Sequence, residues 1–188
     1  MRVSVVVSPE PLVTWEDADA HLKLDGDTSE KTIVEGMIAA ATEHIDGPNG
    51  WLGRAIGVQT LEAYFDTFET MGHGLVLPYP PHIELVGITW RDSNRSKVVG
   101  DPLDYELIGD TIYSLGEAAW SGLHIGREAL TVKYRAGYET LPAAIRAAIL
   151  LMVGDLFRNR TTVLTGLTAS PVPMSTTVEN LLSPFRVF

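Results

Sequence analysis

Apolar residues recur at helical spacing in three stretches of the chain. Between residues 28 and 46 they stand three and four positions apart, on one face of an amphipathic helix; they are Ile33, Val34, Met37, Ile38, Ala41 and Ile45. An earlier stretch begins at Thr14-Trp15-Glu16-Asp17, where a hydroxyl and a carboxylate three residues apart are typical of a capping box. The last begins at Leu141-Pro142, since proline is tolerated in the first turn of a helix. The pattern predicts two N-terminal helices and one long C-terminal helix.

The period changes after residue 58, where short runs rich in β-branched and aromatic residues alternate with turn residues. We expect roughly five to seven strands here, and Arg91-Asp92-Ser93-Asn94 is typical of a hairpin turn. No helical stretch separates the runs, which favours an antiparallel or mixed sheet. The expected fold class is α+β: a mostly helical bundle of the three helices, with a small antiparallel or mixed β element inserted.

The final part of the chain shows no clear period. Residues 161–177 are rich in Thr and contain Pro, and a short apolar stretch follows them. Such a segment is not expected to pack into a core by itself, so we predict an extended C-terminal arm over residues 161–188. The chain then divides into an N-terminal extension (1–11), a single domain (12–160, with its β insertion at about 58–135) and this arm.

Composition narrows the classes of function. The 188 residues include 24 acidic and 14 basic ones, which gives a formal net charge of -10. We do not expect so acidic a chain to bind duplex DNA through a broad cationic face. The chain has no cysteine, which excludes a disulfide framework, a thiolate zinc site and a cysteine nucleophile. No stretch reaches the roughly 18 apolar residues of a membrane-spanning helix, and we expect no membrane partner.

Residues with catalytic or ligand-binding potential are few. The five histidines are scattered, and no two stand at the spacing that adjacent helical turns require for a metal site. We therefore expect no metal, no cofactor and no catalytic centre. Two alternatives stay open: an Asp/Glu hydrolase using Asp17 and Asp19 or Asp101 and Asp104, and a β module that binds a small ligand or carbohydrate. In the second alternative Trp90 and Trp120 would be the stacking platforms.

Segments along the chain, taken in order, resemble one protein family. They are Gly53-Arg54-Ala55, Leu77-Pro78-Tyr79-Pro80-Pro81, Ile88-Thr89-Trp90-Arg91-Asp92, Tyr134-Arg135-Ala136-Gly137-Tyr138, and the run from Leu141-Pro142-Ala143-Ala144-Ile145 to Arg158-Asn159-Arg160. Their joint order and spacing over residues 12–188 are similar to those of the head–tail connector (adaptor) proteins of long-tailed phages and phage-like gene transfer agents.

The resemblance implies a structural virion protein and no enzyme. It implies a ring, dodecameric, that is assembled in the host cytoplasm and lies beneath the portal protein at the head–tail junction. The ring extends the DNA channel and offers a platform to a stopper or tail-completion protein. DNA then passes without tight or specific binding, which agrees with the acidic composition. The C-terminal arm is expected to reach the portal or a neighbouring subunit; its candidate anchors are Leu181, Leu182, Phe185, Arg186 and Phe188.

A ring needs heterologous interfaces, in which each subunit shows different surfaces to its two neighbours. We expect an acidic helix side to meet a more basic stretch across this boundary. The acidic candidates are Glu30, Glu35 and Glu43, and the basic ones are Arg135 and Arg146. The hairpin from Arg91 to Lys97 is a further candidate for contact with a subunit or the tail. Val3 to Val7 is a candidate strand for addition to a neighbour's sheet.

Overall fold

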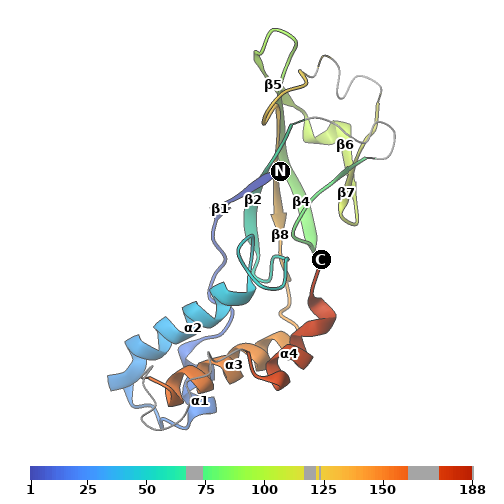
Figure 1. Ribbon diagram of the computed structural model, residues 1–188. Coiled ribbons are helices and arrows are strands. Elements are labelled where there is room, and N and C mark those ends of the chain that lie inside the picture. The colour runs from blue at the N-terminus through green and yellow to red at the C-terminus, as the bar shows by residue number, and fades with distance from the viewer. Residues whose placement is uncertain (67–73, 117–121, 123, 161–173, 188) are drawn as a thin grey trace. The chain divides into compact units, whose positions relative to one another are not determined.

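The structure is a computed structural model, and it describes residues 1–66, 74–116, 122, 124–160 and 174–187. The chain divides into two compact units, drawn together in Figure 1. We call residues 1–10 and 54–139 the β unit, and residues 11–53 and 140–188 the helical unit.

Four α-helices form the described part of the helical unit. They are α1 (Trp15–Leu22), α2 (Lys31–Ile45), α3 (Ala143–Arg158) and α4 (Thr176–Leu182), with short 3-10 turns at Thr28–Glu30 and Ser183–Phe185. The predicted capping box begins α1: the Asp17 amide donates to the Thr14 hydroxyl, and the Thr14 amide donates to the Asp17 carboxylate. Helix α3 contacts each of the other three helices, so the core of the unit is built around it.

The apolar stripe of α2 is confirmed at four of its six members, and a fifth, Met37, is half-buried. Val34, Ile38, Ala41 and Ile45 are buried, whereas Ile33 is 49% exposed. The reason is helical geometry, because each residue turns the helix by about 100° and Ile33 therefore lies roughly 100° from the centre of the buried stripe. The facing side chains on α3 include Ile145, Ile149 and Val153, all of them buried.

The C-terminal residues differ from the expected extended arm. Of residues 161–188 the structure describes 174–187, and these form α4 and the 3-10 turn that follows it. Val178 and Leu182 are fully buried, and α4 packs against α3. The Val187 amide also donates to the Leu52 carbonyl oxygen at 2.9 Å. The prediction of an extended arm is therefore wrong for the described part, because this short helix has an apolar side that α3 can cover.

The β unit consists of two antiparallel sheets. The larger has the strand order β1 (Arg2–Val7), β2 (Gln59–Phe65), β8 (Leu130–Ala136), β4 (His82–Arg91) and β5 (Lys97–Gly100). The smaller has the order β3 (Leu75–Val76), β7 (Thr111–Ser114) and β6 (Tyr105–Ile108), the last preceded by a 3-10 turn at Pro102–Asp104. All strand pairings within both sheets are antiparallel. Of the two predicted arrangements, antiparallel or mixed, the structure therefore has the antiparallel one.

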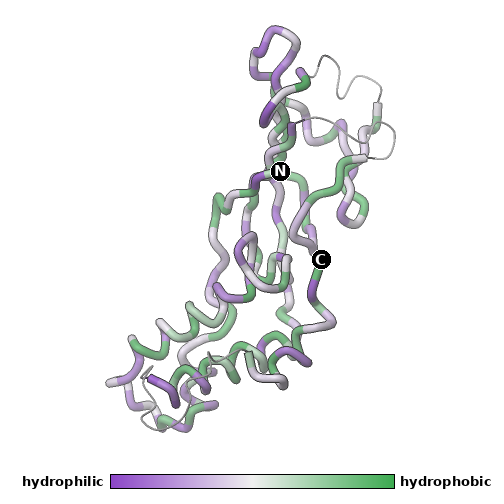
Figure 2. Tube along the Cα trace, viewed as in Figure 1, coloured by the Kyte–Doolittle hydropathy of each residue, from purple (hydrophilic) through white to green (hydrophobic). Residues whose placement is uncertain are grey.

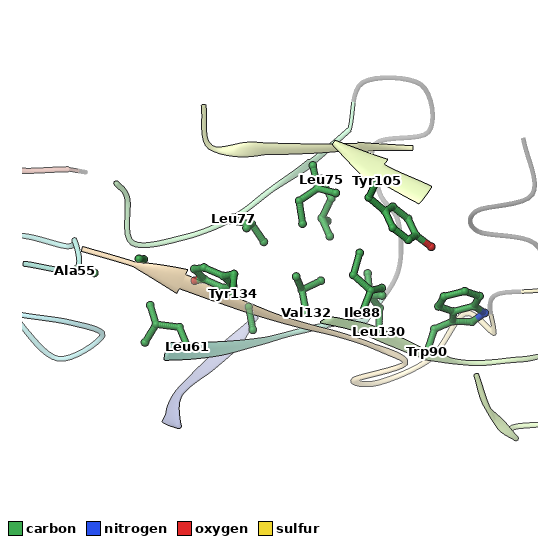
Figure 3. Close-up of a cluster of buried hydrophobic side chains, with 13 residues drawn as sticks. Ala55, Leu61, Leu75, Leu77, Ile88, Trp90, Tyr105, Leu130, Val132 and Tyr134 are labelled. Carbon is green, nitrogen blue, oxygen red and sulfur yellow. The ribbon is translucent and has the colours of Figure 1, made fainter. Parts of the chain in front are cut away.

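A single apolar cluster joins the two sheets. Figure 3 shows Leu75 and Tyr105 of the smaller sheet pointing toward the side chains of Ile88 and Val132 on the larger one. Tyr134 lies in the same cluster, fully buried, and its hydroxyl donates to the Pro78 carbonyl oxygen at 2.7 Å. The smaller sheet thus covers one face of the larger sheet.

The prediction of a mostly helical bundle with a small β insertion is wrong. An insertion of that kind would bury its apolar side chains against helices, whereas these two sheets bury theirs against each other. The N-terminal residues add to this unit as well, because Val3 pairs with Ala63 and Arg2 with Tyr64 along β2 of the same chain. The β part is therefore a second compact unit with its own core, and β1 is an edge strand within it.

Candidate functional site

The face of the larger sheet that points away from the apolar cluster is polar. Strand alternation sends Leu61 and Ala63 into the cluster and Glu62 and Tyr64 to the opposite face. Tyr64 and Thr89 both stand opposite Thr131, so these three residues form one row across β2, β8 and β4. An open groove of about 840 Å³ runs over this face and includes that row.

Four basic side chains line the groove, and we call it the basic groove. They are Arg91, Arg95, Lys97 and Arg127, and all four residues are exposed. None of them makes an ion pair with another described residue. Two acids, Glu62 and Glu128, also line the groove, so cations outnumber carboxylates there although the whole chain is strongly acidic.

The hairpin between β4 and β5 positions three of these cations. Its turn is closed by Asp92, whose carboxylate accepts hydrogen bonds of 2.8 Å from the Asn94 and Ser96 amides. Arg95 takes a left-handed backbone conformation, with φ 64°, and its amide donates to the Asp92 carbonyl oxygen at 2.8 Å. The tip is hydrophilic throughout (Figure 2). The Asp92 carboxylate holds the turn together, and it forms no ion pair with a described arginine or lysine.

The fourth cation, Arg127, lies in the turn that leads into β8. The Arg91 amide donates a hydrogen bond to the Ala129 carbonyl oxygen at 2.9 Å. Arg127 is two residues before Ala129 in the chain, so this bond keeps it near Arg91. The neighbouring Glu128 is paired with Arg2, since Nε and Nη2 of Arg2 lie 2.8 and 3.0 Å from its two carboxylate oxygens. The hydrogen bond from Arg2 holds the pKa of Glu128 below its usual value. One of the two groove acids is thus neutralised within the chain.

The acidic residues predicted as interface candidates lie in the helical unit. Glu35 and Glu43 are exposed on α2, while Glu30 is half-buried and pairs with Arg160, with Oε2 and Nη1 2.9 Å apart. Glu35 lies 3.9 Å from Lys31, one turn earlier on the helix. Glu43 makes no ion pair within the described part of the chain.

The predicted basic candidates lie in different units. Arg135 is on β8 and pairs with Glu84 across the sheet, with 2.6 Å between Nη1 and Oε1. Arg146 is on α3 and pairs with Asp17 of α1. The structure therefore does not bring Arg135 and Arg146 together within one unit, and each already has a partner carboxylate in its own chain.

The C-terminal candidates range from buried to exposed. Leu182 is fully buried, Leu181 and Phe185 are half-buried, and Arg186 is exposed with its guanidinium 4.2 Å above the Trp51 ring. Phe188 lies outside the described residues. The surface that this segment offers to a partner is therefore formed by Arg186 and the half-buried side chains beside it.

Comparison with known proteins gives a result only at the level of structure. No protein-family model and no curated protein sequence matches the chain. A chain in the neck of an empty gene transfer agent particle, computed with C6 symmetry, matches with a TM-score of 0.73 at 16% identity. Chains in the virion of a native gene transfer agent particle and in the neck of a native particle, computed with C12 symmetry, match with TM-scores of 0.66 and 0.60 at 18% and 16% identity. Each comparison covers 100% of this chain and 96% of the other.

The chain shares its fold with these neck and virion chains. The resemblance to head–tail connector proteins is thereby confirmed at the level of the fold, over the whole chain rather than over isolated segments.

The residues of the two alternative functions take structural roles. Trp90 is 7% exposed and packs on Gly100, where an added Cβ would lie 2.8 Å from the indole ring, so it offers no open stacking face. Trp120 lies outside the described residues. The carboxylates of Asp17, Asp19 and Asp101 accept hydrogen bonds from backbone amides at helix starts and turns. Among the described residues no three potential metal ligands converge, and no helix is long and apolar enough to cross a membrane.

Sequence reasoning missed the basic groove. The run from Arg91 to Lys97 did predict a hairpin suited to contact, and three bases in so short a stretch were the available signal. The contribution of Arg127 was not predictable, because it depends on the register of β8 against β4.

Proposed function

We propose that this chain is a structural protein of the virion neck, at the junction of head and tail. The observation that carries the proposal is the likeness of the whole chain to a neck chain of a gene transfer agent particle, at a TM-score of 0.73 with 96% of that chain covered. The match includes both the helical unit and the β unit. A match to both units says more about function than a match to a common β sandwich alone, because fewer proteins combine the same helices and sheets in the same chain order.

In this proposal copies of the chain form a ring, dodecameric, beneath the portal. One of the structures that share the fold is a neck computed with C12 symmetry, which supports a ring of that order. The ring would lengthen the DNA channel and present a surface to a stopper or tail-completion protein. With a formal net charge of -10 per copy, such a ring repels phosphate and lets duplex DNA slide without being held.

The proposal assigns the partner contacts to two kinds of surface. The acidic side of α2, with Glu35 and Glu43, and the larger sheet of the β unit, with Arg135, are proposed to take part in contact between copies. Phe185 and Arg186 are proposed to contribute to contact with the portal. Glu30, Arg146 and Leu182 already have partners within the helical unit, so any part they play in assembly is through the shape of that unit.

A direct test mixes the purified protein with the portal protein of the same particle and images the mixture by negative-stain electron microscopy. We expect a ring of additional density on the tail-facing side of the portal, with twelve-fold averages. The control is the portal alone. Portals that stay bare at a high excess of the protein would rule the proposal out.

A further inference from the structure

We propose that the basic groove receives the outer face of α2 from the next copy of the chain. The inference deepens the proposed ring and rests on it, because it names the two surfaces that meet between neighbours. It would make the contact heterologous: a copy uses its groove toward one neighbour and its α2 toward the other, as a ring requires.

The groove is built in a way that leaves positive charge without a counter-charge. Arg91 and Lys97 are register partners on β4 and β5, so both side chains leave the same face of the sheet side by side. Like charges directly opposite in a sheet are destabilising, and no described carboxylate pairs with either of them. An anionic partner from outside the chain would remove this cost.

The outer face of α2 has the complementary charge. With 3.6 residues per turn, Glu35, Gly36, Ala39 and Glu43 all lie outside the buried stripe, Gly36 and Glu43 nearly opposite it and Glu35 at its flank, and all four are exposed. Between the two glutamates this face carries only small side chains, which let another surface approach the helix closely. Its one internal ion pair, Glu35 with Lys31 at 3.9 Å, is an exposed pair of the kind that contributes little to stability.

The spacing of the charges agrees on the two sides. Glu35 and Glu43 are eight residues apart, which at 1.5 Å per residue corresponds to about 12 Å along the helix. Lys97 and Arg91 stand on the neighbouring strands β5 and β4, and Arg127 lies in the turn that leads into β8, the next strand; two strand spacings of about 4.8 Å correspond to about 10 Å across the sheet. A helix laid across the strands can therefore set both glutamates over cations at once.

The chain's own composition favours a second copy over DNA as the occupant. Residues 11–53 of the helical unit hold nine acids and two lysines, counted from the sequence, so a neighbouring copy presents dense negative charge on a rigid helix. Duplex DNA would have to approach a molecule whose overall charge of -10 opposes it.

The test exchanges charges between the two surfaces. R91E/K97E and E35K/E43K should each abolish rings on the portal, and the variant that carries all four substitutions should form rings again, because the attraction is restored with its sign reversed. K23E/R158E is the matched control: it changes the net charge as much as R91E/K97E does, at two exposed bases outside both surfaces, and should leave the rings intact.

A second measurement decides the inference even if the portal binds nothing. Because the chain has no cysteine, A39C/T89C places one thiol on the outer face of α2 and one in the groove. Under mild oxidation of the concentrated protein we expect a ladder of disulfide-linked oligomers, whereas A39C and T89C alone give dimers at most. The pair A39C/T176C, with its second thiol on an exposed residue of α4, is the control and should give no ladder.

The outcomes separate this inference from the proposed function. Rings that survive R91E/K97E, or an absent ladder, would overturn the groove interface while leaving the neck assignment in place. Portals that stay bare while the disulfide-linked ladder forms would overturn the neck assignment and leave the groove interface in place. Loss of DNA retention in a gel-shift assay at low salt on R91E/K97E, with rings unchanged, would show that the groove binds phosphate instead.

Discussion

Arg91 and Lys97 stand directly opposite each other at the end of the β4–β5 ladder, and both are basic. Glu62 and Lys133, two face positions further into the same sheet, are opposite charges in register on β2 and β8. The sheet thus contains a cross-strand pair of opposite charges, which favours folding, and a cross-strand pair of like charges, which opposes it. The unfavourable pair lies in the groove that we assign to contact between copies.

Reversing one charge of each pair should have opposite effects on stability. Lys97→Glu is expected to raise the free energy of unfolding by up to about 1 kcal/mol, because it converts a like-charge pair into an ion pair. Lys133→Glu, the matched control, should lower it by a similar amount, since it sets two carboxylates opposite each other. Denaturant unfolding of both variants measures the difference. Equal destabilisation by the two substitutions would show that the side chains of Arg91 and Lys97 do not interact.

The start of α1 predicts a pH-dependent contribution to stability. The hydrogen bond from the Thr14 amide, together with Arg146, holds the pKa of Asp17 below its ordinary value of 3.8. A lowered pKa in the folded state stabilises the protein above pH 3.8, and this stabilisation is lost as the pH falls through the folded value. Asp17→Asn should therefore be less stable than the wild type at neutral pH, and the gap should close in acid.

The control for this prediction is Arg146→Ala. It removes the ion pair but leaves the hydrogen bond from Thr14, which has the larger effect on the Asp17 pKa. The gap between this variant and the wild type should be smaller than the gap for Asp17→Asn at neutral pH. Urea unfolding at several pH values measures both. A gap for Asp17→Asn that stays constant down to strongly acidic pH would contradict the assignment.

Tyr134 is expected to stabilise the β unit through its hydroxyl group. Tyr134→Phe should lower the free energy of unfolding by about 1 kcal/mol, because the bond to the Pro78 carbonyl oxygen is lost inside the apolar cluster. Tyr113→Phe is the control, as that ring is 37% exposed, and its effect should stay within about 0.5 kcal/mol. Thermal or denaturant unfolding gives both values, and an unchanged Tyr134→Phe would indicate that the hydroxyl does not make this bond.

The same hydroxyl predicts a loss of stability in alkali. Burial raises the pKa of Tyr134 well above its ordinary value of 10.0, so the unfolded chain releases this proton more readily than the folded one. The stabilisation is fully present below pH 10 and decreases as the pH rises further. Burial raises the pKa of Tyr105 as well, to about 12, so a spectroscopic titration of the tyrosines should find more than one late-ionising group, and their number should fall by one in Tyr134→Phe.

Substitution of Leu182 tests whether this residue belongs to the core of the helical unit or anchors the chain on the portal. Leu182→Ala is expected to cost about 2–5 kcal/mol of unfolding free energy, because it opens a cavity against α3, and Leu181→Ala, at a half-buried position, should cost less. Calorimetry of the two variants provides the comparison. A stable Leu182→Ala protein that no longer joins portals would instead identify Leu182 as the anchor that the sequence first suggested.

Local patterns in the sequence predicted most of the helices and strands. The features that they did not predict, such as the pairing of β1 and the packing of α4, depend on contacts between residues far apart in the chain. The hydroxyl and carboxylate at Thr14 and Asp17, and the spacing of Val34 and Ile38, act within a few residues, so they can be seen in the sequence. The pairing of Val3 with Ala63 joins residues 60 positions apart, and no local pattern encodes it. The same holds for Leu182, whose helix is only seven residues long and follows a stretch without a period.

The candidate site was accessible to sequence reasoning only in part. Glu35 and Glu43 are visible as acids on a helix, and their exposed side follows from the buried stripe. The groove opposite them depends on how β8 pairs with β4 and on which face the smaller sheet covers. These are properties of the assembled sandwich rather than of any one segment.

The edge strand β1 bears on the tendency of the protein to aggregate. Val5, Val6 and Val7 are 43, 44 and 57% exposed on the outermost strand of the sheet. An exposed apolar edge strand can pair with the edge strand of another molecule, which leads to aggregation. The pairing with β2 shifts register between Val5 and Val7, and such an irregularity bends the strand and interrupts its row of free backbone groups. A variant without that irregularity is therefore expected to aggregate more readily through this edge of the sheet.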